Sequence, residues 1–168
     1  MMKSRKIINV PYFKQKRIHT CGPASMKMVF RFFGLHTRES ELAKMMKTEK
    51  EGTKYKALIR IARKKGFYCY VNEKASLNQV KHFIDVGLPV IVNYTEPDTE
   101  EGHYAVVVGY DKDRIVIHDP WNGQRFRLKF REFERRWADK NHWVLVLSKR
   151  EFNIGMQYKP GFFKRFGK

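Results

Sequence analysis

The spacing of apolar residues changes once along this chain of 168 residues, and that change limits the folds it can adopt. Up to about residue 87, apolar residues mostly recur every three or four positions, which is typical of helices with one buried face. From Leu88 onward, runs rich in valine and isoleucine alternate with turn residues, which is typical of strands. Helices first and antiparallel strands second predict an α+β fold, with N-terminal helices packed on a C-terminal antiparallel sheet.

Residues that start and stop helices locate the individual elements. Serine or threonine precedes four helical patterns, and its side chain is expected to cap each helix: Thr20, Thr37, Thr53 and Ser76. Glycines at positions 34, 66 and 87 are expected to end three of these helices. The remaining elements are a helix over 131–137 and strands over 7–13, 67–71, 88–94, 103–110, 114–118, 124–128 and 143–147.

Length and composition fit one globular domain over residues 1–148, followed by a basic and aromatic tail over 149–168. No run of eighteen apolar residues occurs, so no transmembrane helix is predicted. The apolar stretch at the N-terminus is interrupted by Asn9 and stopped by Pro11, and it is too short for a signal peptide. We therefore expect a cytoplasmic protein. The tail is a candidate contact to an anionic membrane surface or an acidic partner, which would make the protein peripheral to the membrane.

The charge balance is strongly basic, with 35 Lys and Arg against 17 Asp and Glu and a net charge of +18. A charge of this sign attracts nucleic acid, anionic lipid or acidic peptides. The basic residues are scattered, however, and no nucleic-acid-binding motif occurs. We therefore favour a solvated cationic surface. Nucleic-acid binding through stacking by the aromatic tail is the weaker alternative.

Cys21 is the candidate nucleophile. It opens the first expected helix, and the N–H groups and dipole of a helix N-terminus favour a thiolate. Gly22 beside it would allow a substrate backbone to approach the sulfur closely. The other cysteine, Cys69, lies in an expected strand and is predicted to be a buried free thiol, so no disulfide is expected.

A cysteine nucleophile needs a base, and six histidines compete for that role. His103 has the best setting, because a loop glycine precedes it and a rigid, valine-rich strand follows it. His118 is the runner-up, at the end of the next expected strand. If these two strands pair as a hairpin, the start of one lies beside the end of the other, which brings Asp119 close to His103. An acid at that place could hold the orientation of the imidazole.

Gln15 stands six residues before the cysteine. Its side-chain amide and the backbone N–H of Cys21 could together bind the oxyanion of an acyl-transfer reaction, and one such donor is worth roughly a hundredfold to a thousandfold in rate. Gly22, Gly102 and Tyr104, which flank the nucleophile and the base, are the expected substrate contacts. No paired cysteine or histidine spacing of a zinc site and no phosphate-binding glycine loop occurs, so we expect neither metal nor cofactor.

Taken together, these motifs resemble the peptidase C39-like group of papain-fold cysteine peptidases. The resemblance spans roughly residues 8–148 and rests on three motifs: Gln15-x5-Cys21-Gly22-Pro23-Ala24, Gly102-His103-Tyr104-Ala105-Val106-Val107 and His118-Asp119-Pro120. It implies a papain-like fold. It also implies that Gln15 supplies the oxyanion hole, Cys21 the nucleophile, His103 the base and Asp119 the group that orients the base.

The best-known members of this group cleave bacteriocin precursors after a double glycine and are fused to an exporting ABC transporter. The Cys-Gly-Pro-Ala motif is closer to relatives that stand alone, so we expect a separate domain whose substrates need not carry a double glycine. The first hypothesis is therefore a cysteine peptidase, or a related amide hydrolase, that acts on a peptide or protein. The second is a module that binds peptides in the same cleft without cleaving them.

Overall fold

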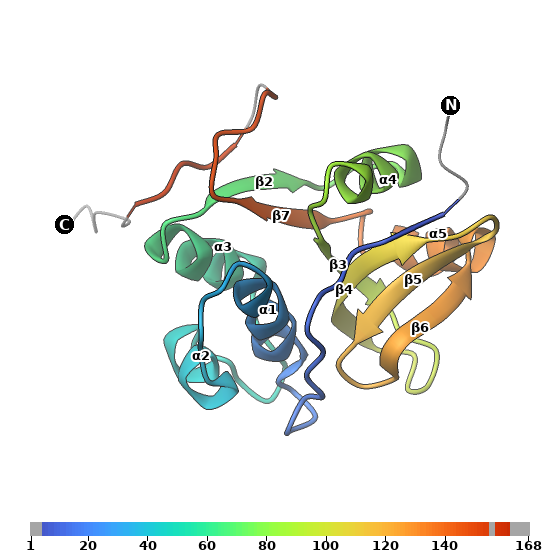
Figure 1. The fold of residues 1–168 in the computed structure, drawn as a ribbon. Coiled ribbons are helices and arrows are strands. Elements are labelled where there is room, and N and C mark those ends of the chain that lie inside the picture. The colour runs from blue at the N-terminus through green and yellow to red at the C-terminus, as the bar shows by residue number, and fades with distance from the viewer. Residues whose placement is uncertain (1–4, 155–156, 162–168) are drawn as a thin grey trace.

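The computed structural model describes residues 5–154 and 157–161 (Figure 1). Its helices are α1 (Cys21–Phe32), α2 (Glu39–Met45), α3 (Tyr55–Lys64), α4 (Leu77–Asp85) and α5 (Phe130–Ala138). Its strands are β1 (Lys6–Ile7), β2 (Tyr68–Asn72), β3 (Val90–Thr95), β4 (Gly102–Tyr110), β5 (Arg114–Asp119), β6 (Gly123–Lys129) and β7 (Val144–Ser148). The predicted α+β class and order of elements are confirmed.

The strands of the described chain form one antiparallel sheet. The strand order is β2-β7-β3-β4-β5-β6, and β1 pairs with β4 in addition. Helix α1 packs against β4 and α2, whereas α5 packs against β3. In Figure 1, α1, α2 and α3 lie together on one side, β4, β5 and β6 lie on the other, and the N-terminal segment runs between them. This arrangement places the start of α1 near the start of β4.

The helix starts confirm one of the four predicted side-chain caps. Ser76 accepts the backbone N–H of Gln79 (3.2 Å), and the Gln79 side chain accepts the backbone N–H of Ser76 (3.1 Å), which is a complete capping box. Thr20 occupies the predicted N-cap position of α1, but its hydroxyl donates to a backbone carbonyl three residues earlier (2.9 Å) and makes no capping bond. The prediction is wrong for Thr37 and Thr53. The N-cap positions of α2 and α3 lie one residue after Thr37 and Thr53.

The N-terminal strand is shorter than the predicted range 7–13. Strand β1 covers Lys6–Ile7, and it is followed by one backbone bond to β4, from the N–H of Ile8 to the carbonyl of Val108 (2.7 Å). The register between β4 and β5 shifts between Val107 and Gly109, next to this bond. Further along the segment, Pro11 has no N–H with which to continue the pairing. The segment still stays against the sheet because the Ile8 side chain is buried.

Gly109 allows β1 to approach β4. A Cβ atom at this position would lie 2.4 Å from the backbone oxygen of Lys6 and 2.9 Å from the Cα of Ile7. We expect Gly109→Ala to displace β1 and to lower the free energy of unfolding by about 1–3 kcal/mol, as overpacking does elsewhere. Urea denaturation measures the loss. Gly102→Ala is the matched control in the same strand, because the close contacts of its Cβ would be with the flexible end of Lys140. Equal losses in the two variants would contradict the prediction.

The chain after β7 returns to the domain. Tyr158 pairs with Cys69 of β2, and the two residues exchange two backbone hydrogen bonds of 2.8 Å. The Phe152 ring packs against the rings of Tyr70 and Phe83. The described part of the predicted tail therefore covers part of the outer edge of β2.

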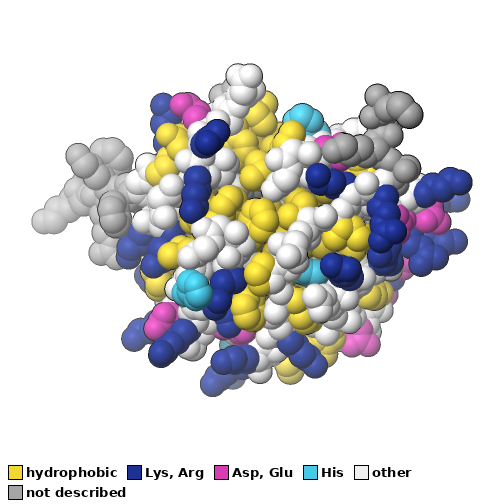
Figure 2. All heavy atoms as spheres, in the orientation of Figure 1, with side chains coloured by type: hydrophobic (Ala, Val, Ile, Leu, Met, Phe, Trp, Pro, Cys, Tyr) yellow, Lys and Arg dark blue, Asp and Glu magenta, His cyan; other side chains and the backbone are white. Residues whose placement is uncertain are grey.

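The basic residues are spread over the surface. Figure 2 shows Lys and Arg side chains distributed around the visible face, with hydrophobic side chains between them. The rest of the predicted tail, residues 155–156 and 162–168, lies outside the described residues, so contacts of the tail with a membrane or nucleic acid stay predictions. Of the helices within 5–154 and 157–161, none combines the length and the apolar character that crossing a membrane requires.

Candidate active site

Cys21 is the first residue of α1, and its side chain is buried at the start of that helix. The later turns of α1 bury methionine, valine and phenylalanine side chains, and the helix packs against β4, which fixes the position of its first turn. None of the described first-turn residues of α1 is acidic. The free N–H groups of the helix start therefore provide a partial positive charge close to the sulfur.

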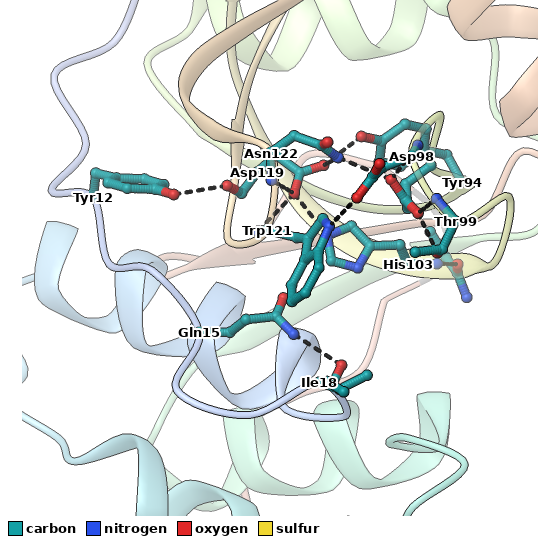
Figure 3. Close-up of polar contacts among 12 residues, drawn as sticks. Tyr12, Gln15, Ile18, Tyr94, Asp98, Thr99, His103, Asp119, Trp121 and Asn122 are labelled. Carbon is teal, nitrogen blue, oxygen red and sulfur yellow. Dashed lines mark hydrogen bonds and ion pairs between the residues drawn. The ribbon is translucent and has the colours of Figure 1, made fainter.

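His103 and Asp119 meet across the predicted hairpin of β4 and β5 (Figure 3). The pairing places Val106 opposite His118, so the start of β4 runs beside the end of β5. His103 Nε2 lies 2.7 Å from Asp119 Oδ1. The His103 residue is 6% exposed and Asp119 is fully buried, so water competes little for this contact.

The protonation of this pair follows from its contacts. Burial lowers the pKa of His103, but hydrogen bonds with Asp119 and with the Cys21 sulfur outweigh burial and raise this pKa to about 10. Burial raises the pKa of Asp119, but hydrogen bonds from His103 and Tyr94 hold it below its usual value. The pair is therefore an imidazolium and a carboxylate at neutral pH. Because Nε2 faces Asp119, Nδ1 is the ring nitrogen left for the thiol.

Asp119 is held by more donors than the sequence suggested. Its Oδ1 accepts the backbone N–H groups of Trp121 (2.8 Å) and Asn122 (2.9 Å) in addition to the His103 ring. Its Oδ2 accepts the Tyr94 hydroxyl and the Asn122 side-chain amide (3.3 Å). Sequence reasoning missed these partners. The only available signal was that Trp121 and Asn122 directly follow the Asp-Pro motif.

Gln15 lines the same pocket as Cys21 and His103, but its amide nitrogen points toward the carbonyl of Ile18 (Figure 3). Nε2 donates to the carbonyls of Arg17 (2.7 Å) and Ile18 (2.8 Å), which uses both amide hydrogens. Oε1 is buried and has no hydrogen-bond partner within the described chain. The backbone N–H of Gln15 donates to the carbonyl of Pro120 (2.9 Å), which ties this loop to the turn after β5. The predicted oxyanion contact therefore requires the amide to rotate.

A pocket of about 220 Å³ lies where Gln15, Cys21 and His103 come together. Its lining comes from the loop before α1, the loop before α3, the β3–β4 loop and the turn after β5: Gln15, Ile18, His19, Cys21, Lys50, Glu51, Gly52, Glu96, Thr99, Glu101, Gly102, His103 and Trp121. Among the described residues, no group of three His, Cys, Asp or Glu side chains is placed to hold a metal ion.

Two of the three predicted substrate contacts lie outside this lining. A Cβ on Gly22 would lie 3.0 Å from the Thr53 side chain and 3.3 Å from the Tyr104 ring, so Gly22 serves the packing of α1. Tyr104 is buried, and its hydroxyl donates to the Thr53 carbonyl (2.8 Å). Gly102 does line the pocket, and its contact with a substrate stays a prediction.

His118, the alternative base, has a structural role. Its Nε2 donates to the carbonyl of Val10 (2.8 Å), and its Nδ1 accepts the backbone N–H of Arg125 (3.2 Å). Burial lowers the pKa of His118, which keeps the ring neutral. With both nitrogens engaged, His118 supports the segment that leads to Gln15, and His103 remains the candidate base.

A known family matches most of the chain. The model of the Peptidase_C39 like family covers residues 7–142. The chain belongs to this family. The family is peptidase-like and the fold is shared with a cysteine protease, which agrees with a thiol and an imidazole that line one pocket and a buried carboxylate that contacts the imidazole.

Two relatives of this C39-like chain are each 33% identical to it over 122 residues. One is the transport/processing ATP-binding protein ComA of Streptococcus pneumoniae, and the match covers 70% of this chain and 16% of ComA. The other is an uncharacterized protein of Methanothermobacter thermautotrophicus, with 72% of this chain and 78% of that protein covered. The C39-like chain thus spans only a small part of the length of ComA.

Two solved structures share the fold. The peptidase domain of Streptococcus ComA, a bi-functional ABC transporter involved in a quorum sensing pathway, has a TM-score of 0.70 at 23% identity, covering 86% of this chain and 98% of that one. The cysteine protease CMS1MS2 of Carica candamarcensis has a TM-score of 0.63 at 12% identity, covering 89% and 100%. The papain-like fold predicted for this C39-like chain is confirmed.

Proposed function

We propose that this chain is a cysteine peptidase, or a related amide hydrolase, that cleaves a peptide or protein through Cys21. The observation that carries the proposal is the 2.7 Å contact between Asp119 and His103, together with the pocket that His103 and Cys21 both line. A nucleophile, a base held by a third group and room for a carbonyl are the parts that covalent acyl transfer needs.

The proposed reaction gives each of these groups a defined part. His103 and the start of α1 stabilise the Cys21 thiolate, which attacks the substrate carbonyl. The backbone N–H of Cys21 donates to the oxyanion, and Gln15 adds a second donor once its amide has rotated. His103 then gives its proton to the leaving amine. The neutral ring next accepts a proton from the water that attacks the acyl carbon, so the acid leaves and the Cys21 thiolate and the His103 imidazolium are restored. Asp119 keeps the His103 ring in place throughout.

Alkylation of Cys21 tests the proposal before any substrate is known. We expect iodoacetamide to modify Cys21 rapidly near neutral pH, and we expect His103→Ala to slow the reaction by about tenfold or more, because a neighbouring imidazolium favours the thiolate. Cys69 is the internal control, because burial raises its pKa to about 12. Mass spectrometry of peptides quantifies both thiols in one sample. A Cys21 rate equal to that of glutathione in both proteins would count against the proposal.

The orientation of Gln15 favours a second candidate function, a peptide-binding module without turnover. An oxyanion at Cys21 would meet the acceptor Oε1 of Gln15, not a donor, if the amide stayed as it is. A peptide library separates the two functions. A peptide that protects Cys21 from alkylation and is recovered uncut favours the module, whereas release of two fragments favours the peptidase.

A further inference from the structure

A second buried carboxylate lies next to the candidate active site and has no role in the proposed reaction. Glu96 is 2% exposed and begins the loop over residues 96–101 that connects β3 to β4. Its Oε1 accepts the backbone N–H and the hydroxyl of Thr99, and its Oε2 accepts the backbone N–H of Asp98 (2.8 Å). Burial raises the pKa of Glu96, but these hydrogen bonds hold it below its usual value. The loop is therefore folded around a charged carboxylate.

Asn122 joins this carboxylate to Asp119. Its side-chain Nδ2 donates to Glu96 Oε2 (3.1 Å) and to Asp119 Oδ2 (3.3 Å), while its backbone N–H donates to Asp119 Oδ1 (2.9 Å). Trp121 makes a parallel link, because its Nε1 donates to Asp98 Oδ2 (2.8 Å) and its backbone N–H donates to Asp119 Oδ1 (2.8 Å). Figure 3 shows Asn122 and Trp121 on either side of the Asp119 carboxylate. Like charges on Glu96 and Asp119 are thus separated by a shared donor.

The same loop forms one side of the pocket. Glu96, Thr99 and Glu101 line the pocket immediately before Gly102 and the base. Arg136 of α5 fixes the loop from the opposite side, because its guanidinium donates to the Thr95 carbonyl (3.2 Å) and to the Glu100 carboxylate (3.0 and 3.3 Å). The loop is therefore anchored to α5 and to the turn that follows Asp119.

We propose that Asn122 and Glu96 are positioning residues for the Cys–His–Asp site. Asn122 fixes the rotation of the Asp119 carboxylate. Glu96 attaches the loop over residues 96–101, which forms one side of the pocket, to the side-chain amide of Asn122. This inference rests on the proposed function and extends it by two residues. Both residues act through Asp119 and the loop. The orientation of His103 and the shape of the pocket therefore depend on one bridge, which consists of the hydrogen bonds from the Asn122 side chain to Glu96 and Asp119.

Asn122→Asp is the decisive variant, because aspartate has the shape of asparagine but offers no donor to the two carboxylates. We expect it to slow Cys21 alkylation by about tenfold to a hundredfold, since small displacements of reacting groups cost rate of that order. We also expect the alkylation pH profile to move, because Asp119 would hold the imidazolium less well. Where a cleaved peptide is available, kcat should fall more than KM rises. If Asn122 only filled space, its replacement by aspartate, which has the same shape, would change neither the alkylation rate nor the pH profile.

A double-mutant cycle tests the bridge itself. Glu96→Gln places an amide where an acceptor is needed, so it should also disturb the contact with Asn122. If both residues act through one bridge, the double variant should lose less than the product of the two single losses. Multiplicative losses from Glu96→Gln and Asn122→Asp would overturn the proposal.

Asp111→Asn is the matched control. Asp111 organises the turn at the far end of the β4–β5 hairpin, where it accepts the backbone N–H groups of Asp113 (3.3 Å) and Arg114 (3.0 Å). The Asp111→Asn variant should lower the free energy of unfolding without moving the pH profile of Cys21 alkylation. An Asn122→Asp profile like that of Asp111→Asn would overturn the positioning role. Slow alkylation of Cys21 in the wild type would instead contradict the proposed function. Failure of the positioning role and failure of the proposed function therefore give different results.

Discussion

Replacement of Cys21 by alanine is expected to abolish peptide hydrolysis, with a loss in kcat of about 10⁵-fold or more. Removal of the nucleophile from a covalent mechanism costs this much because no acyl-enzyme forms, and only binding and oxyanion contacts remain. The fold should persist, since the change removes one sulfur atom at the start of α1 and α1 stays packed against β4. Chromatographic detection of cleaved peptide and a thermal melt measure the two properties separately.

Cys69→Ala is the matched control for this prediction. Cys69 is also a buried free thiol, but it lies in β2 and is absent from the pocket lining. We expect this variant to keep its activity and to lose some stability through the small cavity that it creates. Hydrolysis that survived in Cys21→Ala but not in Cys69→Ala would place the nucleophile elsewhere.

Asp119→Asn is expected to lower kcat by about 10⁴-fold, the size of effect found when the acid of a catalytic triad becomes an amide. An amide facing His103 Nε2 can present a donor where the ring needs an acceptor, which favours the wrong tautomer. The variant also removes the carboxylate that raises the pKa of His103 to about 10. Wild-type activity that needs the imidazolium should therefore persist up to about pH 10, whereas that of the variant should fall at lower pH. A pH profile of kcat tests this.

The same pair predicts how stability depends on pH. The pKa of His103 is raised in the folded state, so its contribution is complete below the unfolded value near 6.5 and is lost as the pH rises to about 10. The pKa of Asp119 is lowered, so its contribution is present above the unfolded value and is lost as the pH falls through the folded one. The stability advantage of wild type over Asp119→Asn should therefore shrink at both extremes. Urea denaturation across pH measures it, and a constant difference would contradict the assignment.

The His103–Asp119 contact could be predicted because a hairpin is a local structure. The two residues are 16 positions apart, and one turn with two alternating strands fixes which ends meet. The Glu96–Asn122 contact spans 26 positions, but it joins a loop to a turn, and neither segment has a periodic pattern. Polar residues in loops are expected to face solvent, so nothing in the sequence indicated that Glu96 is buried.

The other differences between the predicted and the observed site also arise from contacts between segments that are distant in the sequence. The Gln15 amide donates to carbonyls of its own loop, and the shape of that loop depends on a backbone hydrogen bond to the turn after β5. Gly22 and Tyr104 were expected to face a substrate because they flank the reactive residues. They face each other and Thr53 because α1 lies directly on β4.

The return of the chain to β2 has a consequence for self-association. An edge strand with free N–H and C=O groups is a template for pairing with another molecule, and natural proteins cover such edges. Tyr158 takes up the backbone groups of Cys69, and Phe152 holds the returning segment against the core. A chain cut after Ser148, at the boundary suggested by sequence, would expose this edge and invite intermolecular strand pairing and aggregation.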